Sequence, residues 1–485
     1  MLLEVKDLKI EFNDKTGKTE AVRGISFDLE EGEILGLVGE SGSGKSTAAL
    51  CLMGLLPGSA SYSGSIVFEG EELIDADFEA LRKIKGSRVS MVFQEALSSL
   101  NPLIRVGKQV EEMLILHPGE RPLSKEERKA RVLEMFAFVD LPEPEEIYKK
   151  YPHELSGGMQ QRVMIAMALI CGPKLLIADE PTTALDAKVQ DQILDLLKDI
   201  NKKTGTSIIF VSHDLRVIQR LCSRVMVMYE GKIIERGSVS EIFEDPQQDY
   251  TKKLIAAISD EKKEADPFTS DTVLEVRDLS VFYKIKTQKF SEGTQKKYVC
   301  KDMSFVVHKG EILGLVGKSG IGKSSISRAI LGLHKDYTGQ IILKEENPQM
   351  VFQDSASSLN PARKVGWILE EPLKNMTKLS KKERKKKVEE MLALVELPKE
   401  YAKRYPRQLS GGQKQRVNIA LALISGSKFI IADEPVSALD VTIQEQILNL
   451  LLKLQKELGL SMVFISHDIN VVNRICDRVI EFPEI

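Results

Sequence analysis

The sequence predicts an α/β protein that contains two copies of one unit, each built around a mainly parallel sheet. A 36-residue stretch from Tyr151 to Asp186 returns from Tyr405 to Asp440 with 24 identical residues and no gap. Such an internal repeat indicates a duplicated structural unit. Around it, short apolar segments alternate with segments of helical periodicity. That alternation is typical of a parallel sheet covered by helices.

The composition limits the class of protein. A chain of 485 residues has room for two to four domains, and 29% charged with 42% hydrophobic residues is ordinary for a globular protein. The net charge of −3 and the pI of about 6.2 argue against a general attraction to nucleic acid or anionic lipid.

The cysteines and the apolar runs bear on location. Five cysteines stand singly, at positions 51, 171, 222, 300 and 476, without metal-ligand or disulfide-framework spacing. A reducing cytoplasm is therefore expected. The N-terminus carries charges where a signal peptide needs an apolar run, and no apolar run of about 18 residues occurs. We expect any membrane role to pass through a partner.

The first copy is expected to begin with two antiparallel strands, Leu2–Phe12 and Ala21–Leu29. The apolar strand 33–39 then leads into a glycine loop and a helix over 48–56. Residues 75–154 are rich in helix formers. Within them, helical spacing places four apolar residues on one face: Val132, Leu133, Phe136 and Val139.

The remainder of the first copy alternates between helix and strand. The predicted elements are a helix over 160–170, a strand over 174–178, a helix over 187–201 and a strand over 207–211. A strand, a turn and a second strand follow over 224–236. This order predicts the parallel core of the sheet.

Domains are predicted at 1–258 and 272–485, joined by a polar and flexible linker over 259–271. The second copy differs in two places. From the loop lysine to the later glutamine, the separation falls from 49 residues (45 to 94) to 30 residues (323 to 353), which predicts a shortened arm. The printed chain ends at Ile485, so we expect the second copy to lack the final strand–turn–strand and tail.

Two glycine loops fit the pattern G-x-x-x-x-G-K-[ST], each after an apolar strand. Glycines let backbone N–H groups curl around phosphate oxygens at the start of a helix. A glycine turn with an exposed lysine could carry the same letters once, but the repeated context favours two phosphate loops. The predicted loop residues are Gly39, Ser41, Gly42, Gly44, Lys45, Ser46, Thr47, Gly317, Ser319, Gly320, Gly322, Lys323, Ser324 and Ser325. Lys45 and Lys323 should reach the β- and γ-phosphates of ATP, and Ser46 and Ser324 should bind Mg²⁺.

Two apolar strands, 175–180 and 429–434, end in paired acids. Asp179 and Asp433 suit Mg²⁺ coordination at the carboxyl end of the sheet. Glu180 and Glu434 suit the general base that polarises the attacking water. Two solvated acids at a strand end are the alternative, which the phosphate loops upstream disfavour.

The motifs LSGGMQQR and LSGGQKQR resemble the signature motif of ABC-transporter ATPases, and the resemblance covers almost the whole chain. It implies two cassettes that pack head to tail, with each ATP between the phosphate loop of one and the signature of the other. Lys45 would then share its ATP with Ser410, and Lys323 with Ser156. The signature residues are Ser156, Gly157, Gly158, Ser410, Gly411 and Gly412. Each triplet also suits a plain helix N-cap.

The same resemblance assigns further residues. Gln94 and Gln353 match the glutamine loop that senses Mg²⁺ and the permease, and His213 and His467 match the switch histidine at the γ-phosphate. Two acids match the loop at the cassette interface, and two aromatic residues match the ring that stacks on adenine. These are Asp186 and Asp440, then Phe12 and Tyr283.

A narrower resemblance, to the oligopeptide/dipeptide/nickel importer ATPases, rests on FQEALSSLNP, FQDSASSLNP and the tail DPQQDYTKKLIAAI. Three features depart from that group: the second copy has no such tail, no cysteine cluster follows Tyr250, and Glu95 stands where the second copy has Asp354.

These observations predict the ATP-hydrolysing subunit of a binding-protein-dependent importer at the cytoplasmic face of the membrane. One chain with two competent ATP sites would serve two permease subunits and, through them, a solute-binding protein. A soluble twin-cassette factor that acts on ribosomes or nucleic acid is the alternative, and a degenerate second copy that serves as scaffold is another. Peptide, nickel and other metal-chelate cargoes stay open, because the ATPase contacts the permease and not the cargo.

Overall fold

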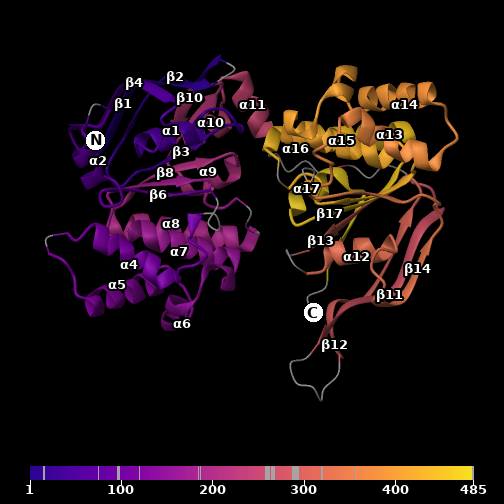
Figure 1. The fold of residues 1–485 in the computed structure, drawn as a ribbon, viewed down its shortest axis with the longest axis horizontal. Coiled ribbons are helices and arrows are strands. Elements are labelled where there is room, and N and C mark those ends of the chain that lie inside the picture. Colours follow the sequence, from indigo (N-terminus) through magenta and orange to yellow (C-terminus); the bar gives the residue numbers. More distant parts are fainter. Residues whose placement is uncertain are drawn as a thin grey trace. The chain divides into compact units, whose positions relative to one another are not determined.

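The computed structural model describes residues 1–14, 17–74, 76–94, 99–119, 121–183, 185, 187–256, 263, 268–286, 294–317, 321–354, 357–437 and 439–482. The chain divides into two compact units, Met1–Ile258 and Ser259–Ile485 (Figure 1). Each unit combines a mainly parallel sheet, an antiparallel sheet and helices, which confirms the predicted fold class. That 1–258 and 272–485 act as two functional domains stays a prediction.

The first unit is built on a six-stranded sheet in which only the edge pair β10–β9 is antiparallel. In order across the sheet, the strands are β10 (Lys232–Ser238), β9 (Arg224–Tyr229), β3 (Ile34–Val38), β8 (Ser207–Ser212), β7 (Leu175–Asp179) and β6 (Val89–Val92).

The central strands β3, β7 and β8 are buried and mostly apolar, as expected for a sheet that is covered on both faces. Along β3, Leu35 and Leu37 belong to the core beneath the antiparallel sheet and helix α1, whereas Ile34 and Val38 belong to the core beneath the remaining helices. Successive side chains of a strand point to opposite faces. Residues of the single strand β3 therefore contribute to both cores.

The antiparallel sheet of the first unit has the order β2 (Gly17–Leu29), β1 (Leu3–Asp14), β4 (Ala60–Phe68), β5 (Glu71–Glu72). Its helices are α1 (Lys45–Leu52), α2 (Phe78–Ile84), α4 (Val106–Leu116), α5 (Lys125–Phe138), α6 (Pro144–Lys149), the 3₁₀ helix η1 (Pro152–Glu154), α7 (Gly157–Leu169), α8 (Ala187–Thr204), α9 (Leu215–Leu221), α10 (Val239–Glu244) and α11 (Asp249–Ala256).

The second unit repeats this plan with fewer elements. Its parallel sheet has the order β15 (Gln349–Val351), β16 (Phe429–Asp433), β17 (Ser461–Ser466), β13 (Ile312–Val316), β18 (Arg478–Glu481), and its antiparallel sheet has the order β12 (Thr294–His308), β11 (Thr272–Lys286), β14 (Tyr337–Leu343). Its helices are α12 (Lys323–Ile330), α13 (Val365–Met376), α14 (Lys381–Leu394), η2 (Lys399–Lys403), η3 (Pro406–Gln408), α15 (Gly411–Leu423), α16 (Val441–Leu458) and α17 (Ile469–Ile475).

Two predicted elements need correction. The helix expected over 48–56 begins earlier, at Lys45, and ends at Leu52. It begins early because the last residues of the phosphate loop already form its first turn, and it ends just before Gly54, whose φ of +54° is left-handed. The final strand–turn–strand is not wholly missing from the second unit, since β18 pairs in parallel with β13.

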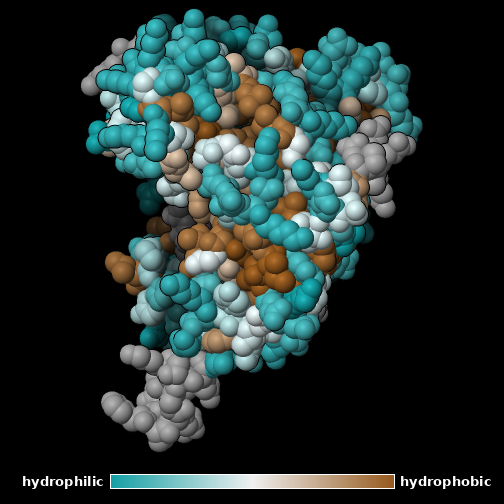
Figure 2. Space-filling model, turned by 90° about the vertical axis from the view of Figure 1, so that its right-hand side faces the viewer, coloured by the Kyte–Doolittle hydropathy of each residue, from teal (hydrophilic) through white to brown (hydrophobic). Residues whose placement is uncertain are grey.

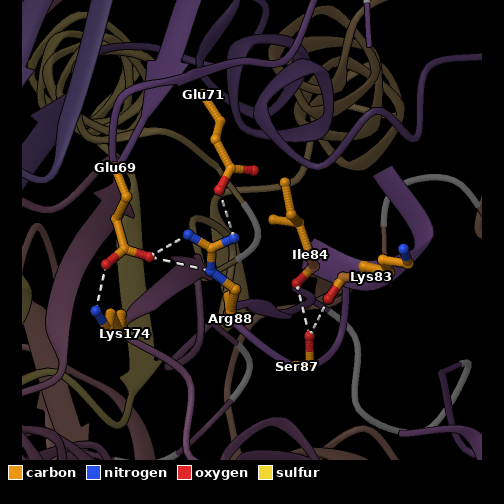
Figure 3. Close-up of polar contacts among 7 residues, drawn as sticks. All are labelled: Glu69, Glu71, Lys83, Ile84, Ser87, Arg88 and Lys174. Atoms are coloured by element: carbon orange, nitrogen blue, oxygen red, sulfur yellow. Dashed lines mark hydrogen bonds and ion pairs between the residues drawn. The ribbon is translucent and has the colours of Figure 1, made fainter. Parts of the chain in front are cut away.

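The antiparallel sheet of the first unit is tied to the parallel core by charged side chains (Figure 3). Arg88, which precedes β6, donates hydrogen bonds to Glu69 at 3.0 Å and to Glu71 at 3.1 Å. Lys174, which precedes β7, forms an ion pair with the same Glu69. Two strands of the core are thus linked to the β4–β5 turn.

At Lys263 the predicted linker is bound to the second unit. The ammonium of Lys263 lies 2.6 Å from Oδ1 of Asp477, a fully buried carboxylate, and its backbone N–H donates to Asn473. The other oxygen of Asp477 accepts from the backbone of Ile312. At this position, therefore, the linker is part of the second unit.

We predict that Lys263→Met lowers the free energy of unfolding of the second unit by about 3 kcal/mol, because Asp477 would remain as a buried charge without its cation. Trp367 is the single tryptophan of the chain, so urea unfolding followed by its fluorescence reports on this unit.

The double variant Lys263→Met/Asp477→Ser is the matched control. Ser223 occupies the equivalent place in the first unit and needs no cation. The double variant should regain most of the lost stability. A single variant as stable as the parent would show that the pair does not anchor the linker.

Candidate nucleotide sites

In the first phosphate loop, Lys45 lies at the start of α1 and is hydrogen-bonded to backbone carbonyls. Lys45 is buried, and its ammonium donates to the carbonyl oxygens of Gly39 and Glu40, both at 2.7 Å. Gly44 caps the helix with a left-handed φ of +102°, and a Cβ there would lie 2.4 Å from the carbonyl oxygen of Ala21. Only glycine fits this position.

The second phosphate loop repeats this arrangement at the start of α12. Lys323 is buried and donates to the carbonyl oxygen of Gly317 at 2.5 Å, and it also lies 3.4 Å from Oε1 of Glu434. Gly322 caps the helix with the same φ of +102°. The predicted loop residues Ser319 and Gly320 lie outside the described residues.

The first acid of each pair lies beside the serine that follows the loop lysine. In the first unit, the hydroxyl of Ser46 donates to Oδ1 of Asp179 at 3.0 Å. Burial raises the pKa of Asp179 to about 6, against the hydrogen bond from Ser46, and the adjacent Glu180 adds to the rise. The charge of Lys45 offsets only part of this rise, so a further cation would stabilise the charged carboxylate.

The first acid of the second unit, Asp433, lies in a similar environment. Burial raises the pKa of Asp433, against the effect of the Ser324 hydroxyl. Its Oδ1 is buried without a hydrogen-bond donor among the described residues. A hydroxyl and an acceptor-rich carboxylate are the oxygen ligands that Mg²⁺ prefers, so Ser46 with Asp179, and Ser324 with Asp433, fit this ion.

The second acid of each pair is held by three side chains. In the first unit, Glu180 contacts Nδ1 of His213 at 3.0 Å and accepts from Nε2 of Gln94 and from the hydroxyl of Thr183, both at 2.9 Å. In the second unit, Glu434 accepts from Nε2 of Gln353 at 2.9 Å, and it lies 3.3 Å from Nδ1 of His467 and 3.4 Å from Nζ of Lys323. The structure therefore brings the predicted glutamine, glutamate and histidine together in both units.

The electrostatics keep this glutamate charged. Burial alone would raise the pKa of Glu180, but the hydrogen bond and charge of His213, the hydroxyl of Thr183 and the charge of Lys45 together outweigh it, and the pKa lies below the usual value. The pKa of Glu434 is likewise lowered, with His467 and Lys323 outweighing burial. The hydrogen bond with Glu434 in turn raises the pKa of His467. The glutamates are thus available as proton acceptors at neutral pH.

Both glutamates have a left-handed backbone, with φ of +47° at Glu180 and at Glu434. Their backbone N–H groups nevertheless donate to the neighbouring strand, to Val211 and Ile465 respectively, at 2.9 Å. Non-glycine residues with positive φ are uncommon and concentrate at functional sites. The turn separates each glutamate side chain from the preceding aspartate.

The signature serines begin helices α7 and α15 as N-caps. The hydroxyl of Ser156 accepts from the backbone of Met159 at 3.4 Å, and that of Ser410 from Gln413 at 3.3 Å. Gly158 has no room for a side chain, because a Cβ there would lie 2.6 Å from Val189. Gly412 is equally confined, at 2.4 Å from Ile443. Gly157 and Gly411 precede them, and Asp186 lies outside the described residues.

The two predicted adenine-stacking residues differ. Tyr283 is exposed, and its hydroxyl lies 3.0 Å from that of Ser325 in α12, which places the ring beside the second phosphate loop. Phe12 is partly buried and packs against the core beneath the antiparallel sheet. Its role in adenine binding stays a prediction with less support than that of Tyr283.

Two site residues were missed by the sequence interpretation. Thr183 donates to Glu180, and its signal was a hydroxyl residue three positions after that acid. Tyr250 contacts the first phosphate loop through its hydroxyl, which accepts from the backbone of Glu40 at 2.9 Å. It belongs to the tail that the sequence interpretation used only as a mark of a subfamily.

Comparison with known proteins gives consistent matches. The sequence profile of a family described as "ABC transporter" matches residues 22–183 and 300–437. A protein of Pectobacterium atrosepticum named "Glutathione import ATP-binding protein GsiA" is 39% identical over 526 aligned positions, which cover 99% of this chain and 84% of that protein. The protein of the same name from Escherichia coli K12 is 40% identical over 530 positions, with the same coverage. Among solved structures, the ATP-binding cassette MJ0796 bound to ADP and Pi is 30% identical, with a TM-score of 0.45, and covers 49% of this chain and 99% of its own.

The raised pKa of Asp179 predicts a pH-dependent gain in stability for Asp179→Asn in the absence of nucleotide. A carboxyl whose pKa rises from 3.8 to about 6 on folding destabilises the folded state increasingly between these values, and fully above pH 6. Removing the charge should raise the free energy of unfolding by about 3 kcal/mol at pH 8 and by about half of that at pH 5.

Urea unfolding followed by circular dichroism at the two pH values measures this difference. Asp199→Asn, at an exposed position of α8, serves as the control and should change the stability by less than about 0.5 kcal/mol at either pH. An Asp179→Asn gain that does not grow between pH 5 and pH 8 would contradict the assignment.

Proposed function

The chain belongs to the ABC transporter family, and from that premise we propose that it is the motor subunit of a binding-protein-dependent importer with two working ATP sites. The predicted family is confirmed, and so are its activity and cofactors: the chain hydrolyses ATP, with Mg²⁺, coupled to transport across a membrane, as an importer subunit. The two sites, the partners and the cargo are the proposal.

The observation that carries the proposal is the repeated glutamate cluster. In each unit, one buried carboxylate lies against a glutamine and a histidine, at the ends of neighbouring strands. We assign Glu180 and Glu434 as the groups that orient and deprotonate the attacking water. His213 and His467 would contact the γ-phosphate, and Gln94 and Gln353 would link the site to its Mg²⁺ and to the permease.

ATP phosphates would bind at the two glycine loops, where Lys45 and Lys323 exchange backbone carbonyls for phosphate oxygens. Mg²⁺, when bound, supplies positive charge to the phosphates. Ser46 with Asp179, and Ser324 with Asp433, would hold it. The pairing of Lys45 with Ser410, and of Lys323 with Ser156, across two ATP molecules stays a prediction from the signature motif.

A membrane partner is supported by exposed apolar side chains beside the glutamine loops. Leu103 is 84% exposed and Ile104 39%, directly after the SSLNP segment of the first unit. In the second unit, Phe352 and Trp367 are exposed at 43% and 41%, and Figure 2, viewed from the side of this unit, shows hydrophobic patches among hydrophilic residues. Exposed apolar groups of this kind mark interaction sites. No helix in the described part of the chain is long and apolar enough to cross a bilayer.

We therefore propose two permease subunits as partners, with a solute-binding protein on their far side and one chain per transporter. The protein would lie at the cytoplasmic face of the membrane. The relatives named as import proteins support this reading over a factor that acts on ribosomes or nucleic acid.

For the cargo, we propose short peptides. Two relatives are named for glutathione import, and the alignment with this chain covers 84% of the length of each. Glutathione is itself a small peptide. ATPase activity of the purified complex with its permeases and binding protein should rise on addition of glutathione or di- to tetrapeptides. Stimulation by a nickel chelate, with no response to any peptide, would overturn this choice.

We predict that the double variant Glu180→Gln/Glu434→Gln binds ATP but hydrolyses it at least about 10²-fold more slowly, because both general bases are lost while the phosphate loops stay intact. Phosphate release and nucleotide binding are measured on the same preparation. Glu112→Gln, at an exposed position of α4, should leave both unchanged. Hydrolysis at the parental rate would remove the glutamates from the base role.

Lys323→Ala separates two working sites from a scaffold role of the second unit. Because the second unit repeats the contacts of the first, this variant alone should lower the turnover. Unchanged turnover would make the second unit a scaffold.

A further inference from the structure

Tyr250 links the tail of the first unit to its phosphate loop. It lies in α11, and its hydroxyl accepts a hydrogen bond from the backbone N–H of Glu40 at 2.9 Å. Glu40 stands in the loop between Gly39 and Ser41. The ring of Tyr250 packs on that of Tyr229, with a centroid distance of 4.4 Å.

The position of this hydroxyl is fixed by the core. The next residue of α11, Thr251, is fully buried, and Leu254 is buried in the core beneath the helices. Just before the helix, the backbone N–H groups of Gln247 and Gln248 both donate to the carboxylate of Glu235 on β10. The buried side chains of α11 and the hydrogen bonds just before it therefore fix this helix, and with it Tyr250, on the first unit.

Both backbone polar groups of Glu40, in the phosphate loop, form hydrogen bonds. The carbonyl oxygen of Glu40 accepts from Lys45, while its N–H donates to Tyr250. In the proposed function Lys45 exchanges this carbonyl for a phosphate oxygen, which would remove one of the two bonds. The bond to Tyr250 does not involve Lys45, and it is available to hold Glu40 after the lysine has moved.

A second contact comes from the same part of the chain. The N–H of Gly231, in the turn between β9 and β10, donates to the carbonyl oxygen of Ser43 at 3.0 Å. Both supports thus follow β8 in the sequence. Preorganised backbone geometry raises the affinity for a ligand because less conformational freedom is lost on binding.

We infer that Tyr250 is a positioning residue of the first nucleotide site, which holds Glu40 so that the loop keeps its phosphate-binding shape when Lys45 turns to ATP. The inference rests on the proposed function, in which Lys45 binds the phosphates of ATP.

The test uses the full chain with the second site silenced by Lys323→Ala, and TNP-ATP as the probe. Tyr250→Phe keeps the ring packing and removes only the hydroxyl. The dissociation constant should rise by up to about tenfold, because the free loop would no longer be held in its phosphate-binding shape and the free energy of one neutral hydrogen bond sets the upper limit. In the chain with both sites intact, KM for ATP should rise while kcat stays within about twofold, because ground-state binding alone is weakened.

Tyr148→Phe is the matched control, since it removes a hydroxyl bond of 2.7 Å to Glu111 in the helical part of the same unit. It should lower the thermal stability without changing TNP-ATP affinity. An unchanged affinity in Tyr250→Phe, with ATP binding lost in Lys45→Ala, would overturn the inference alone. Unchanged binding in Lys45→Ala would overturn the proposed function itself.

Discussion

Two adjacent carboxyl groups at the end of one buried strand impose the main constraint on each unit. Like charges on neighbouring residues in a buried place cannot share one environment without a large pKa shift. The left-handed backbone at Glu180 resolves this by directing the two side chains to different partners. Asp179 meets Ser46 and has a raised pKa, whereas Glu180 meets His213 and has a lowered one. Environments that separate two pKa values also separate two chemical roles, here those proposed for the metal ligand and the base.

The order of the strands brings the side chains that contact Glu180 to one edge of the sheet. Strand β7, which carries both acids, lies between β6 and β8. All three are parallel, so their carboxyl ends meet at one edge, where ligands bind in open α/β sheets. Gln94 follows β6 and His213 follows β8, so they reach Glu180 from opposite sides. The phosphate loop follows β3, which is the other neighbour of β8. Sheet topology therefore assembles the cluster from segments far apart in the chain.

Residues with a fixed spacing inside a motif could be predicted from the sequence. Lys45, Asp179 and Glu180 lie in motifs whose letters follow from phosphate and metal chemistry, and the alternation of apolar runs gave the parallel sheet. Contacts between distant segments could not be predicted, because no local pattern encodes them. Tyr250 reaches Glu40 over 210 positions through a tail that sequence alone marked only as a family trait. The early start of α1 was missed for another reason: the loop glycines, which read as a turn, already cap the helix.

In both units the glutamate contacts a glutamine and a histidine, but the hydroxyl three positions later bonds to its carboxylate in the first unit (Thr183) and to its backbone carbonyl in the second (Ser437). The residues that support the edge of the sheet also differ. In the first unit, Arg88 binds the carboxylates of Glu69 and Glu71, whereas Asn347, at the equivalent position, bonds to Ser425 instead. Ser223 of the first unit corresponds to Asp477, whose buried charge takes its cation from the linker. A buried charge that depends on a distant cation contributes little net stability, but it specifies where the cation must lie. The contacts of the glutamate with glutamine and histidine are thus common to both units, whereas the contacts that support the sheet differ between them.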